Sequence, residues 1–386
     1  MRKSLWSRRG FLGACAAGGF AMRATGGDWP KGMSHVGLDH FEHYTDEKTR
    51  ARVYRLTSGP QRDDVVYQTH PMWSPDMGLL VFHSDRTSGT MTPHVLETST
   101  GKVRPLLPDG KGGDFTLTHR GADVFWLSGR DVYTAPLRAL FAGDAAPQRI
   151  ASLPESVQRT QGMLSVDAKE AVLYTGAVFE VDKRWGIIGL NLKSGAWDTL
   201  AEVDFPVGHV QANPARADLV MFCHETGGYA DQRTWLLDAA RRTHRPLYVS
   251  PSRQWVTHEL WWGGDRVLFT VWPYDDEHRE LEHGILMADL DGAHTVVTQY
   301  PAWHTHGSPD KRWILGDDFD RNLWLIDAQT HERRLLTHGH EGGGLKTHPH
   351  ASFTPDSQSI VFNSSRFGTA DILLVELPAW ESLPQP

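Results

Sequence analysis

Five histidines recur at one position of a repeat in this chain of 386 residues. In three of the repeats the histidine lies six residues before the aspartate of a Ser-Pro-Asp or Thr-Pro-Asp turn. If the repeats form a ring, equivalent positions face one axis, and we expect the imidazoles to converge there. Converging imidazoles can bind a metal ion or transfer a proton. The five histidines are His70, His209, His258, His304 and His350.

The elements that must position these histidines are short strands in a regular order. The inner strands centre near positions 70, 115, 161, 209, 258, 304 and 350, where Phe115 and Gln161 replace histidine in the second and third repeats. A period of about 44 to 49 residues is typical of four-stranded propeller blades. The sequence therefore predicts an all-β fold, a seven-bladed β-propeller.

The two ends of the repeat array indicate how the ring closes. The last repeat has no fourth strand after Glu376, whereas the segment from Arg52 to Thr57, ahead of the first repeat, has the pattern of one. We interpret this segment as the outer strand of the last blade, because a closed ring leaves no exposed sheet edge. Residues 49–380 are then one propeller domain.

The N-terminus has the features of an export signal. Arg8 and Arg9 form a twin-arginine pattern, and a weakly apolar stretch follows, with small residues such as Ala24 near a possible cleavage point. We predict a signal peptide over 1–24, a linker over 25–48 and a periplasmic location. The alternative is a disordered basic start.

The net charge and the cysteine content limit which binding partners and which disulfides are possible. Residues 1–24 carry five basic and no acidic side chains, so their removal takes the formal charge from -8 to -13. A protein this acidic is a poor candidate for nucleic acid, and the sequence predicts no membrane association once the signal is removed. Of the two cysteines, Cys15 lies in the signal, where lipidation stays open, and Cys223 is left without a disulfide partner.

The densest histidine cluster is Thr347-His348-Pro349-His350. Residues two apart on a strand share a face, so His348 and His350 can point toward the same axis. With His304 from the neighbouring blade they offer three nitrogen ligands, which suits a catalytic divalent metal. The alternative is that each histidine only satisfies a buried turn.

These strings resemble the oligogalacturonate lyases, a seven-bladed propeller family of polysaccharide lyases. The resemblance covers the C-terminal half well, and the N-terminal blades match only as generic propeller. The matching segments, in the family's order, are Gly208-His209, Phe222-Cys223-His224-Glu225, Arg233-Thr234-Trp235, Thr257-His258-Glu259-Leu260-Trp261, His304 and the run from Thr347 to Asp356.

The resemblance implies a manganese ion held by three histidines and a glutamine. The histidines fall on His304, His348 and His350, and the glutamine falls on Leu345, which cannot bind a metal. Water, His306, or a loop residue such as His340 or Glu341 could take its place. The metal could also be a different one, bind weakly, or be absent.

The resemblance also implies roles for four further residues. The catalytic base falls on His258 and the substrate-binding arginine on Arg233. His209 and His224 fall on positions near the substrate pocket, although hydrogen bonds between blade turns would explain them equally well. A neutral imidazole is a suitable base near neutral pH, and a guanidinium is a planar, permanently charged partner for a carboxylate.

The first function that we expect is therefore an exported lyase. It would cleave short, soluble oligogalacturonates from pectin by metal-assisted β-elimination and leave a 4,5-unsaturated uronate. One alternative is a lyase-like propeller that acts on a different uronate or sugar. The other is a non-catalytic propeller, similar to TolB, that binds a protein or peptide. The oligomeric state stays open.

Overall fold

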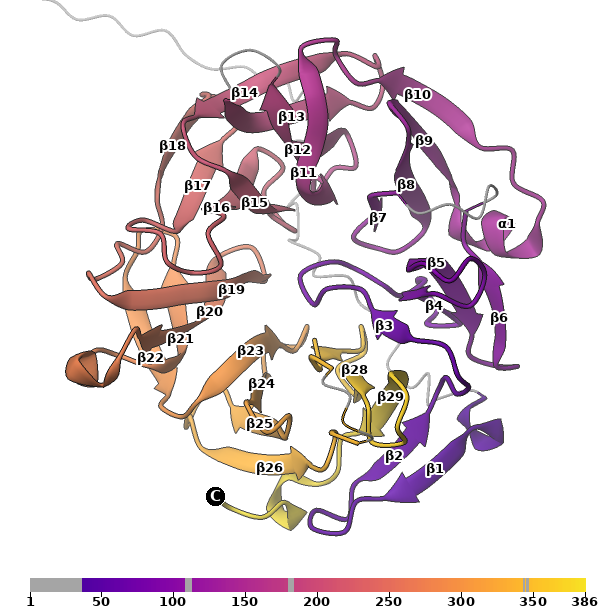
Figure 1. The fold of residues 1–386 in the computed structure, drawn as a ribbon, viewed down its shortest axis with the longest axis vertical. Helices are drawn as coiled ribbons and strands as arrows, with labels where there is room; N and C mark the ends of the chain where they lie inside the picture. The colour runs from indigo at the N-terminus through magenta and orange to yellow at the C-terminus, as the bar shows by residue number, and fades with distance from the viewer. Residues whose placement is uncertain (1–36, 108–112, 180–183, 343, 345–346) are drawn as a thin grey trace, which may run out of the picture.

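The computed structural model describes residues 37–107, 113–179, 184–342, 344 and 347–386. The predicted signal peptide and Leu345 lie outside the described residues. Seven sheets stand around a central axis, as Figure 1 shows, so the predicted seven-bladed β-propeller is confirmed. None of the helices among the described residues has the length and hydropathy that a membrane-spanning segment needs.

The blades follow one another along the chain with their strands antiparallel, and in the first six blades the strands are in sequence order from the axis outward. The first blade comprises β3 (Asp63–Val65), β4 (Leu79–Ser84), β5 (Thr92–Glu97) and β6 (Lys102–Pro105). The second comprises β7 (Phe115–Leu117), β8 (Asp123–Ser128), β9 (Asp131–Pro136) and β10 (Gln148–Ser152), with α1 (Leu137–Ala142) before β10. The third comprises β11 (Val157–Val166), β12 (Val172–Phe179), β13 (Trp185–Asn191) and β14 (Trp197–Val203). The fourth comprises β15 (Val207–Ala212), β16 (Leu219–His224), β17 (Thr234–Asp238) and β18 (Thr243–Pro246).

The remaining blades contain most of the predicted site. The fifth comprises β19 (Gln254–Trp262), β20 (Arg266–Pro273), β21 (Gly284–Asp289) and β22 (His294–Thr298), with η2 (Asp276–His278) after β20. The sixth comprises β23 (Ala302–Gly307), β24 (Trp313–Asp318), β25 (Leu323–Asp327) and β26 (Arg333–Thr337). The seventh comprises β27 (Ser352–Phe353), β28 (Ser359–Ser364), β29 (Asp371–Glu376), β2 (Arg52–Arg55) and β1 (Glu42–Thr45). Two short turns, η1 (Leu38–His40) and η3 (Trp380–Ser382), lie near the chain ends.

The seventh blade closes the ring with one strand more than the sequence predicted. β2 pairs with β29, as expected, but it also pairs with β1 on its other side. Residues 42–45, which we expected within a linker over 25–48, are thus part of the sheet, and the segment from Arg52 is not its outermost strand. The physical reason is the Asp46 carboxylate, whose Oδ1 accepts from the N–H groups of Lys48 and Thr49, both at 3.0 Å, and holds a tight hairpin.

Side-chain hydrogen bonds join the closing blade to both neighbours. Asp46 Oδ2 accepts from Thr337 Oγ1 at 2.8 Å and from the His338 N–H at 2.9 Å, which links the seventh blade to the sixth. Asn363 Oδ1 accepts from the Val65 N–H at 2.7 Å, which links it to the first. Burial alone would raise the pKa of Asp46, but the hydrogen bonds that it accepts outweigh burial and lower the pKa to about 2.

The recurrent turn between the first two strands of a blade has a shared geometry. The Ser or Thr hydroxyl donates to the aspartate two residues later at 2.6–2.7 Å. It accepts from the N–H five residues later at 2.8–3.0 Å. The residue after the aspartate takes a left-handed φ between 55° and 62°. These turns, at Ser74, Ser308 and Thr354, fix the register of the inner strand and hence the height of the histidine that precedes them.

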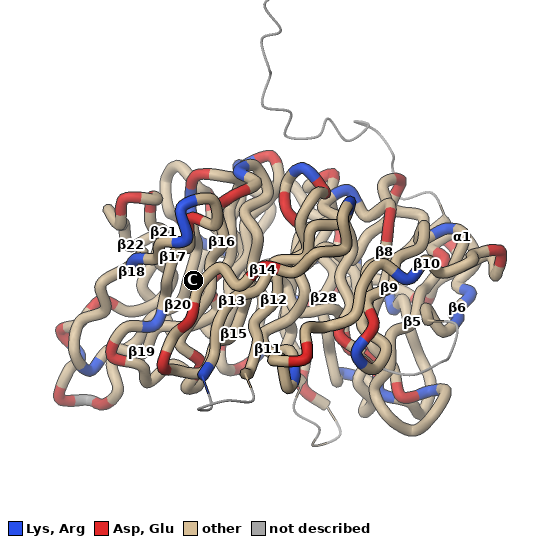
Figure 2. Tube along the Cα trace, turned by 90° about the horizontal axis from the view of Figure 1, so that it is seen from above, with Lys and Arg blue, Asp and Glu red and all other residues tan. Residues whose placement is uncertain are grey.

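Apolar packing lies between neighbouring blades rather than on the axis. Val207 and Val210 of β15, for example, pack with Ile187 of β13 in the preceding blade. The axis is left to polar side chains from the inner strands. Figure 2 shows the ring from its edge as a flat disc, with acidic and basic residues interspersed on the loops.

Candidate functional site

The inner strands are irregular where the histidines stand. The pairing register shifts between Gly208 and Gln211 in the fourth blade and between Thr257 and Leu260 in the fifth. A bulge of this kind bends the strand and redirects a side chain. Three of the histidines have a left-handed backbone conformation, which is uncommon for a residue with a side chain. They are His209 (φ 48°), His258 (φ 58°) and His350 (φ 41°). The backbone thus holds these three imidazoles toward the axis.

The predicted metal-binding histidines come together. One nitrogen from each of His304, His348 and His350 lies within 4.8 Å of the others. Burial lowers the pKa of all three imidazoles, and lowers it well below the ordinary value for His304 and His350. At neutral pH each ring is therefore uncharged and has one lone pair to offer, which is the state that binds a metal.

The surroundings of His304 fit a metal ligand. Its Nε2 is buried without a hydrogen-bond partner among the described residues, and its Nδ1 lies 2.8 Å from Asp317 Oδ2. A carboxylate behind the far nitrogen is the usual support of a metal-binding imidazole. Burial raises the pKa of Asp317 to about 8, so a cation at His304 would displace a proton from this pair.

Trp303 makes a contact that affects His348. The Trp303 indole Nε1–H donates to His348 Nδ1 at 3.0 Å. A neutral imidazole has one lone pair, so His348 carries its hydrogen on Nε2 in this arrangement. If His348 binds a metal through Nδ1, the tryptophan must leave. If it binds through Nε2, the hydrogen must move to Nδ1, which also breaks the bond to Trp303.

The three residues that could replace the missing glutamine as a fourth metal ligand make other contacts. His306 Nδ1 accepts from the Phe353 N–H at 3.4 Å, and His340 Nδ1 lies 3.2 Å from Ser364 Oγ. Glu341 pairs with Arg321 at 2.9 Å. None of these three belongs to the group formed by the predicted ligands. The candidate protein ligands among the described residues are thus three imidazoles, and water could fill the other positions of a bound metal.

His258 lies beside this group and contacts a tyrosine. Its ring centroid is 4.2 Å from that of His304, and its Nδ1 lies 2.8 Å from the Tyr67 hydroxyl. Burial, together with the nearby His304, His209 and His350, lowers the pKa of His258 well below its ordinary value. The imidazole is therefore neutral and can accept a proton. Burial also raises the pKa of Tyr67, so the phenol stays protonated.

Arg233 is fully buried and held by two carboxylates. Its Nε donates to Glu259 Oε1 at 2.9 Å, and its Nη1 lies 3.6 Å from Glu225 Oε1. Arg233 and Glu259 are each 1% exposed, whereas the Glu225 side chain is 33% exposed. Burial opposes charge on all three groups, but the attraction between the guanidinium and the carboxylates outweighs burial. This attraction raises the pKa of Arg233 and lowers the pKa of both glutamates.

His209 and His224 lie on the two sides of Arg233. His209 Nε2 is 3.5 Å from Glu225 Oε2, and its Nδ1 is 3.9 Å from Glu259 Oε2. His224 stacks on Phe205 at 4.4 Å between ring centroids, and its carbonyl oxygen accepts from Arg233 Nη1 at 3.4 Å. His209 thus faces the axis, whereas the His224 ring packs on the blade and supports Arg233 through its backbone.

His209, Cys223 and Glu225 form a second group whose atoms would suit a metal, since they also lie within 4.8 Å of one another. Two observations argue against a cation there. The Arg233 guanidinium already balances Glu225, and burial raises the pKa of the Cys223 thiol, which would have to lose its proton to bind a metal. As expected, Cys223 is a buried free cysteine.

The prediction that all five repeated histidines converge was wrong for His70. Its Nε2 lies 3.0 Å from the carbonyl oxygen of Leu164 on β11, and its Nδ1 lies 2.7 Å from Thr69 Oγ1. β3 ends at Val65, so this part of the first blade lies outside a strand, and the side chain is buried and bonded to the inner strand of the third blade. Tyr67, from the same loop, contacts the axial histidines instead.

Sequence reasoning missed three residues of the site, which are Tyr67, Glu259 and Asp317. Tyr67 stands outside the repeated position, so no periodic signal marks it. Glu259 follows the predicted base directly, and that adjacency was a usable signal, because a bulge turns both residues inward. Asp317 lies opposite His304 on the adjacent strand, and its contact depends on the strand register.

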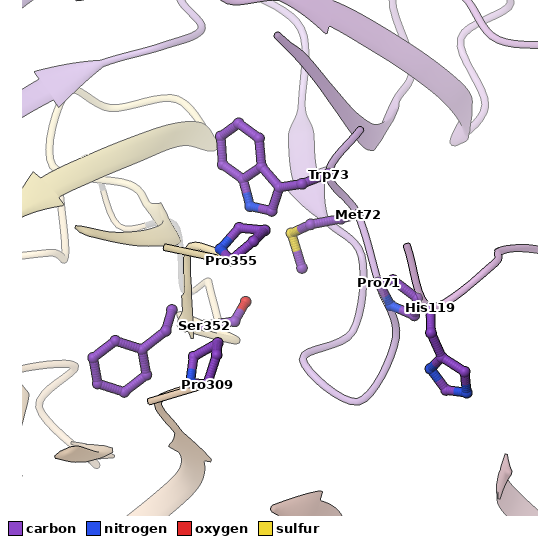
Figure 3. A pocket seen from close by; sticks show the side chains of 8 residues that line it. Pro71, Met72, Trp73, His119, Pro309, Ser352 and Pro355 are labelled. Carbon is purple, nitrogen blue, oxygen red and sulfur yellow. The ribbon is translucent and has the colours of Figure 1, made fainter. Parts of the chain in front are cut away.

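Two cavities lie near the axis. One, of about 120 Å³, is lined by Trp303, Asp317, Asp318, Phe319, Arg321, His348 and Pro349, so it opens beside the predicted metal ligands. The other, of about 180 Å³, is lined by Pro71, Met72, Trp73, His119, Pro309, Ser352, Phe353 and Pro355 at the turn ends of the inner strands (Figure 3). Its lining is mostly apolar and includes none of the predicted site residues.

Comparison with known proteins gives one consistent family. No family model matches the sequence. The oligogalacturonide lyase of Pectobacterium atrosepticum is 25% identical over 216 residues, which cover 50% of this chain and 55% of that protein. The oligogalacturonate lyase of Dickeya dadantii is 26% identical over 217 residues, with the same coverage. The chain thus matches about half the length of these curated relatives.

The solved structures agree on the fold. A structure described as oligogalacturonate lyase in complex with manganese superposes with a TM-score of 0.76 at 20% identity and covers 88% of this chain and 96% of that chain. Sequence similarity over half of the chain supports the resemblance to oligogalacturonate lyases, and the solved structure shows that this protein shares the fold of one, a seven-bladed propeller.

Proposed function

We propose that this protein cleaves short oligogalacturonates by β-elimination and leaves a 4,5-unsaturated uronate on one fragment. The observation that carries the proposal is the position of His258, a neutral imidazole in contact with one of three candidate metal-binding imidazoles and near a buried guanidinium. The names of the two curated relatives support the substrate class.

His258 is the base in this proposal. Elimination from a uronate begins with loss of the C5 proton beside the carboxylate. A neutral imidazole near that carbon can accept the proton as a general base. The low pKa that burial gives His258 keeps it unprotonated before the reaction, and its half-buried ring can still reach a ligand.

Arg233 stabilises the charge that develops on the uronate carboxylate. The guanidinium offers a planar set of donors for a carboxylate. Glu225, which is partly exposed, is the carboxylate that a substrate can replace on Nη1. Buried Glu259 keeps its hydrogen bond to Nε and fixes the plane of the guanidinium.

His304, His348 and His350 are the ligands for a divalent cation, which we propose to be manganese, as in the related solved structure. When bound, such a cation neutralises the uronate carboxylate and stabilises an enolate-like charge. The small acidic oligosaccharide is thus the expected partner. We also propose periplasmic export by the twin-arginine signal over 1–24.

The test is ultraviolet absorbance of purified protein with digalacturonate and trigalacturonate, with added manganese and after chelation. We expect a rise from the unsaturated product that chelation abolishes. His258→Gln should lose it, and His70→Gln, which changes a buried histidine outside the site, is the matched control. If absorbance rises with no uronate, the proposed elimination is refuted. If absorbance rises only with another uronate, the elimination stands and only the proposed substrate changes.

A further inference from the structure

Tyr67 occupies the place where the axial histidines of three blades meet. Its ring centroid lies 5.2 Å from that of His209, 6.4 Å from that of His258 and 5.0 Å from that of His350. It comes from the first blade, in the half of the chain where only generic propeller features were recognised. The side chain is partly exposed, so a bound molecule can reach it.

The hydroxyl of Tyr67 shares a hydrogen bond with the proposed base, 2.8 Å from His258 Nδ1. A neutral phenol–imidazole pair can make this bond in two ways. If His258 Nδ1–H donates, Nε2 has a free lone pair and the phenol hydrogen is free. If the phenol donates, Nε2 carries the hydrogen. Only the first arrangement offers a base and an acid at the same time.

We propose that Tyr67 is a catalytic residue that protonates the departing oxygen while His258 removes the C5 proton. This inference rests on the proposed elimination. The C5–H and C4–O bonds break, the electron pair from C5–H forms the C4=C5 double bond, and the departing oxygen takes the phenol hydrogen. The resulting imidazolium then passes its Nδ1 hydrogen to the phenolate. The pair ends neutral, with hydrogen on Nε2, and resets by exchange with water.

Four other groups around His258 cannot serve as this acid. His304 and His350 direct lone pairs into the predicted metal site. Arg233 never gives up its proton at ordinary pH, and Glu259 is ionised beside it. Tyr67 is the neutral O–H donor in direct contact with His258 among the described residues.

The experiment compares two substrates that differ in how much the leaving group needs a proton. One is trigalacturonate, and the other is a galacturonide with fluorine at C4, which leaves as fluoride. Tyr67→Phe should lower kcat on trigalacturonate about 10²- to 10⁴-fold, the usual contribution of an acid, and lower fluoride release less than about tenfold. His258→Gln should lose both reactions.

The outcomes separate the inference from the function on which it rests. If Tyr67→Phe loses equal activity on both substrates, or loses none on either, the acid role is overturned while the elimination itself stands. A wild-type protein inactive on both substrates would count against the proposed function. Tyr174→Phe is the matched control, because it removes a buried hydroxyl that donates to the Ala217 carbonyl in another part of the ring.

A second measurement does not need turnover. Nitrogen NMR of histidine-labelled, chelated protein reports which nitrogen of His258 carries hydrogen, and His258→Gln assigns the signals. We expect the His258 signals to move in Tyr67→Phe and to stay in Tyr174→Phe. Unmoved signals in Tyr67→Phe would overturn the Tyr67–His258 pair whatever the activity.

Discussion

Two groups of side chains on the axis contain similar ligand atoms and treat charge in opposite ways. His304, His348 and His350 are neutral, and the carboxylate behind His304 would support a cation taken up from solution. In the second group, His209, Cys223 and Glu225 surround a cation that the chain supplies itself, the buried Arg233. Spacing of ligand atoms is thus not enough to define a metal site, because the net charge of the neighbours decides whether a cation is stabilised.

The division also explains how the two groups can act on one substrate. A uronate carboxylate lying between them would meet a positive charge on each side, one exchangeable and one permanent. His258 and Tyr67 lie between the groups, since Tyr67 contacts His209 of one and His350 of the other. The residues proposed to transfer protons therefore stand between the two groups.

The largest expected effect comes from removing the permanent cation. Arg233→Met leaves Glu259 buried without its partner, which should lower the free energy of unfolding by about 3–5 kcal/mol. Urea denaturation of the wild type and the variant measures this. The double variant Arg233→Met/Glu259→Leu should recover most of the loss, because it removes both charges. A single variant as stable as wild type would show that the second group is not held by this pair.

The next effect concerns the exchangeable cation. His348→Ala should weaken manganese binding by more than the roughly 10- to 100-fold that loss of an outer-shell partner costs, since it removes a direct ligand. Calorimetric titration with manganese measures the affinity. Cys223→Ser is the matched control and should leave affinity and stoichiometry unchanged. The reverse pattern, with only Cys223→Ser affected, would exchange the roles of the two groups.

Acid should weaken the ion pair between Glu259 and Arg233, beside the second group, in a defined pH range. Burial would raise the pKa of Glu259, but Arg233 and His209 lower it more, so its pKa in the fold lies below the value of roughly 4.3 in an unfolded chain. Its contribution to stability is therefore complete above about pH 4.3 and is lost as the pH falls through the folded-state pKa. The difference in unfolding free energy between wild type and Glu259→Gln should shrink as the pH falls below about 4.3. A difference that stays constant over that range would contradict the ion pair.

The smallest effect concerns the hydrogen bond from Trp303 to His348. Metal binding must break this bond, which contributes roughly 0.5–1.5 kcal/mol. Trp303→Phe should therefore tighten manganese binding by about 2- to 10-fold, as titration calorimetry can measure. Trp272→Phe, which changes a ring stacked on Trp303, is the control. Weaker binding in Trp303→Phe would mean that the indole supports the ligand rather than competing for it.

Much of the fold could be predicted because its signals are local. The Ser-Pro-Asp and Thr-Pro-Asp turns set the period, and the unmatched segment from Arg52 indicated the closing blade. The extra strand β1 could not be foreseen, since its hairpin depends on how the Asp46 carboxylate is held, and that includes Thr337 from another blade. The candidate site divides in the same way: His348 and His350 were visible as a pair, whereas Asp317 depends on pairing between strands.

The sequence by itself determined the repeat, the ring and the set of inner-strand positions, because turn residues and strand periodicity act over a few residues. Only the tertiary structure decided which side chains meet on the axis. Tyr67 and His258 are 191 residues apart, and His70 bonds to Leu164 rather than joining the other histidines. Equivalent positions share a place in the repeat, but their contacts depend on the neighbours opposite, and a repeat does not specify these. The charge balance around Arg233, which argues against a metal ion in the second group, also depends on such contacts and was decided by the tertiary structure.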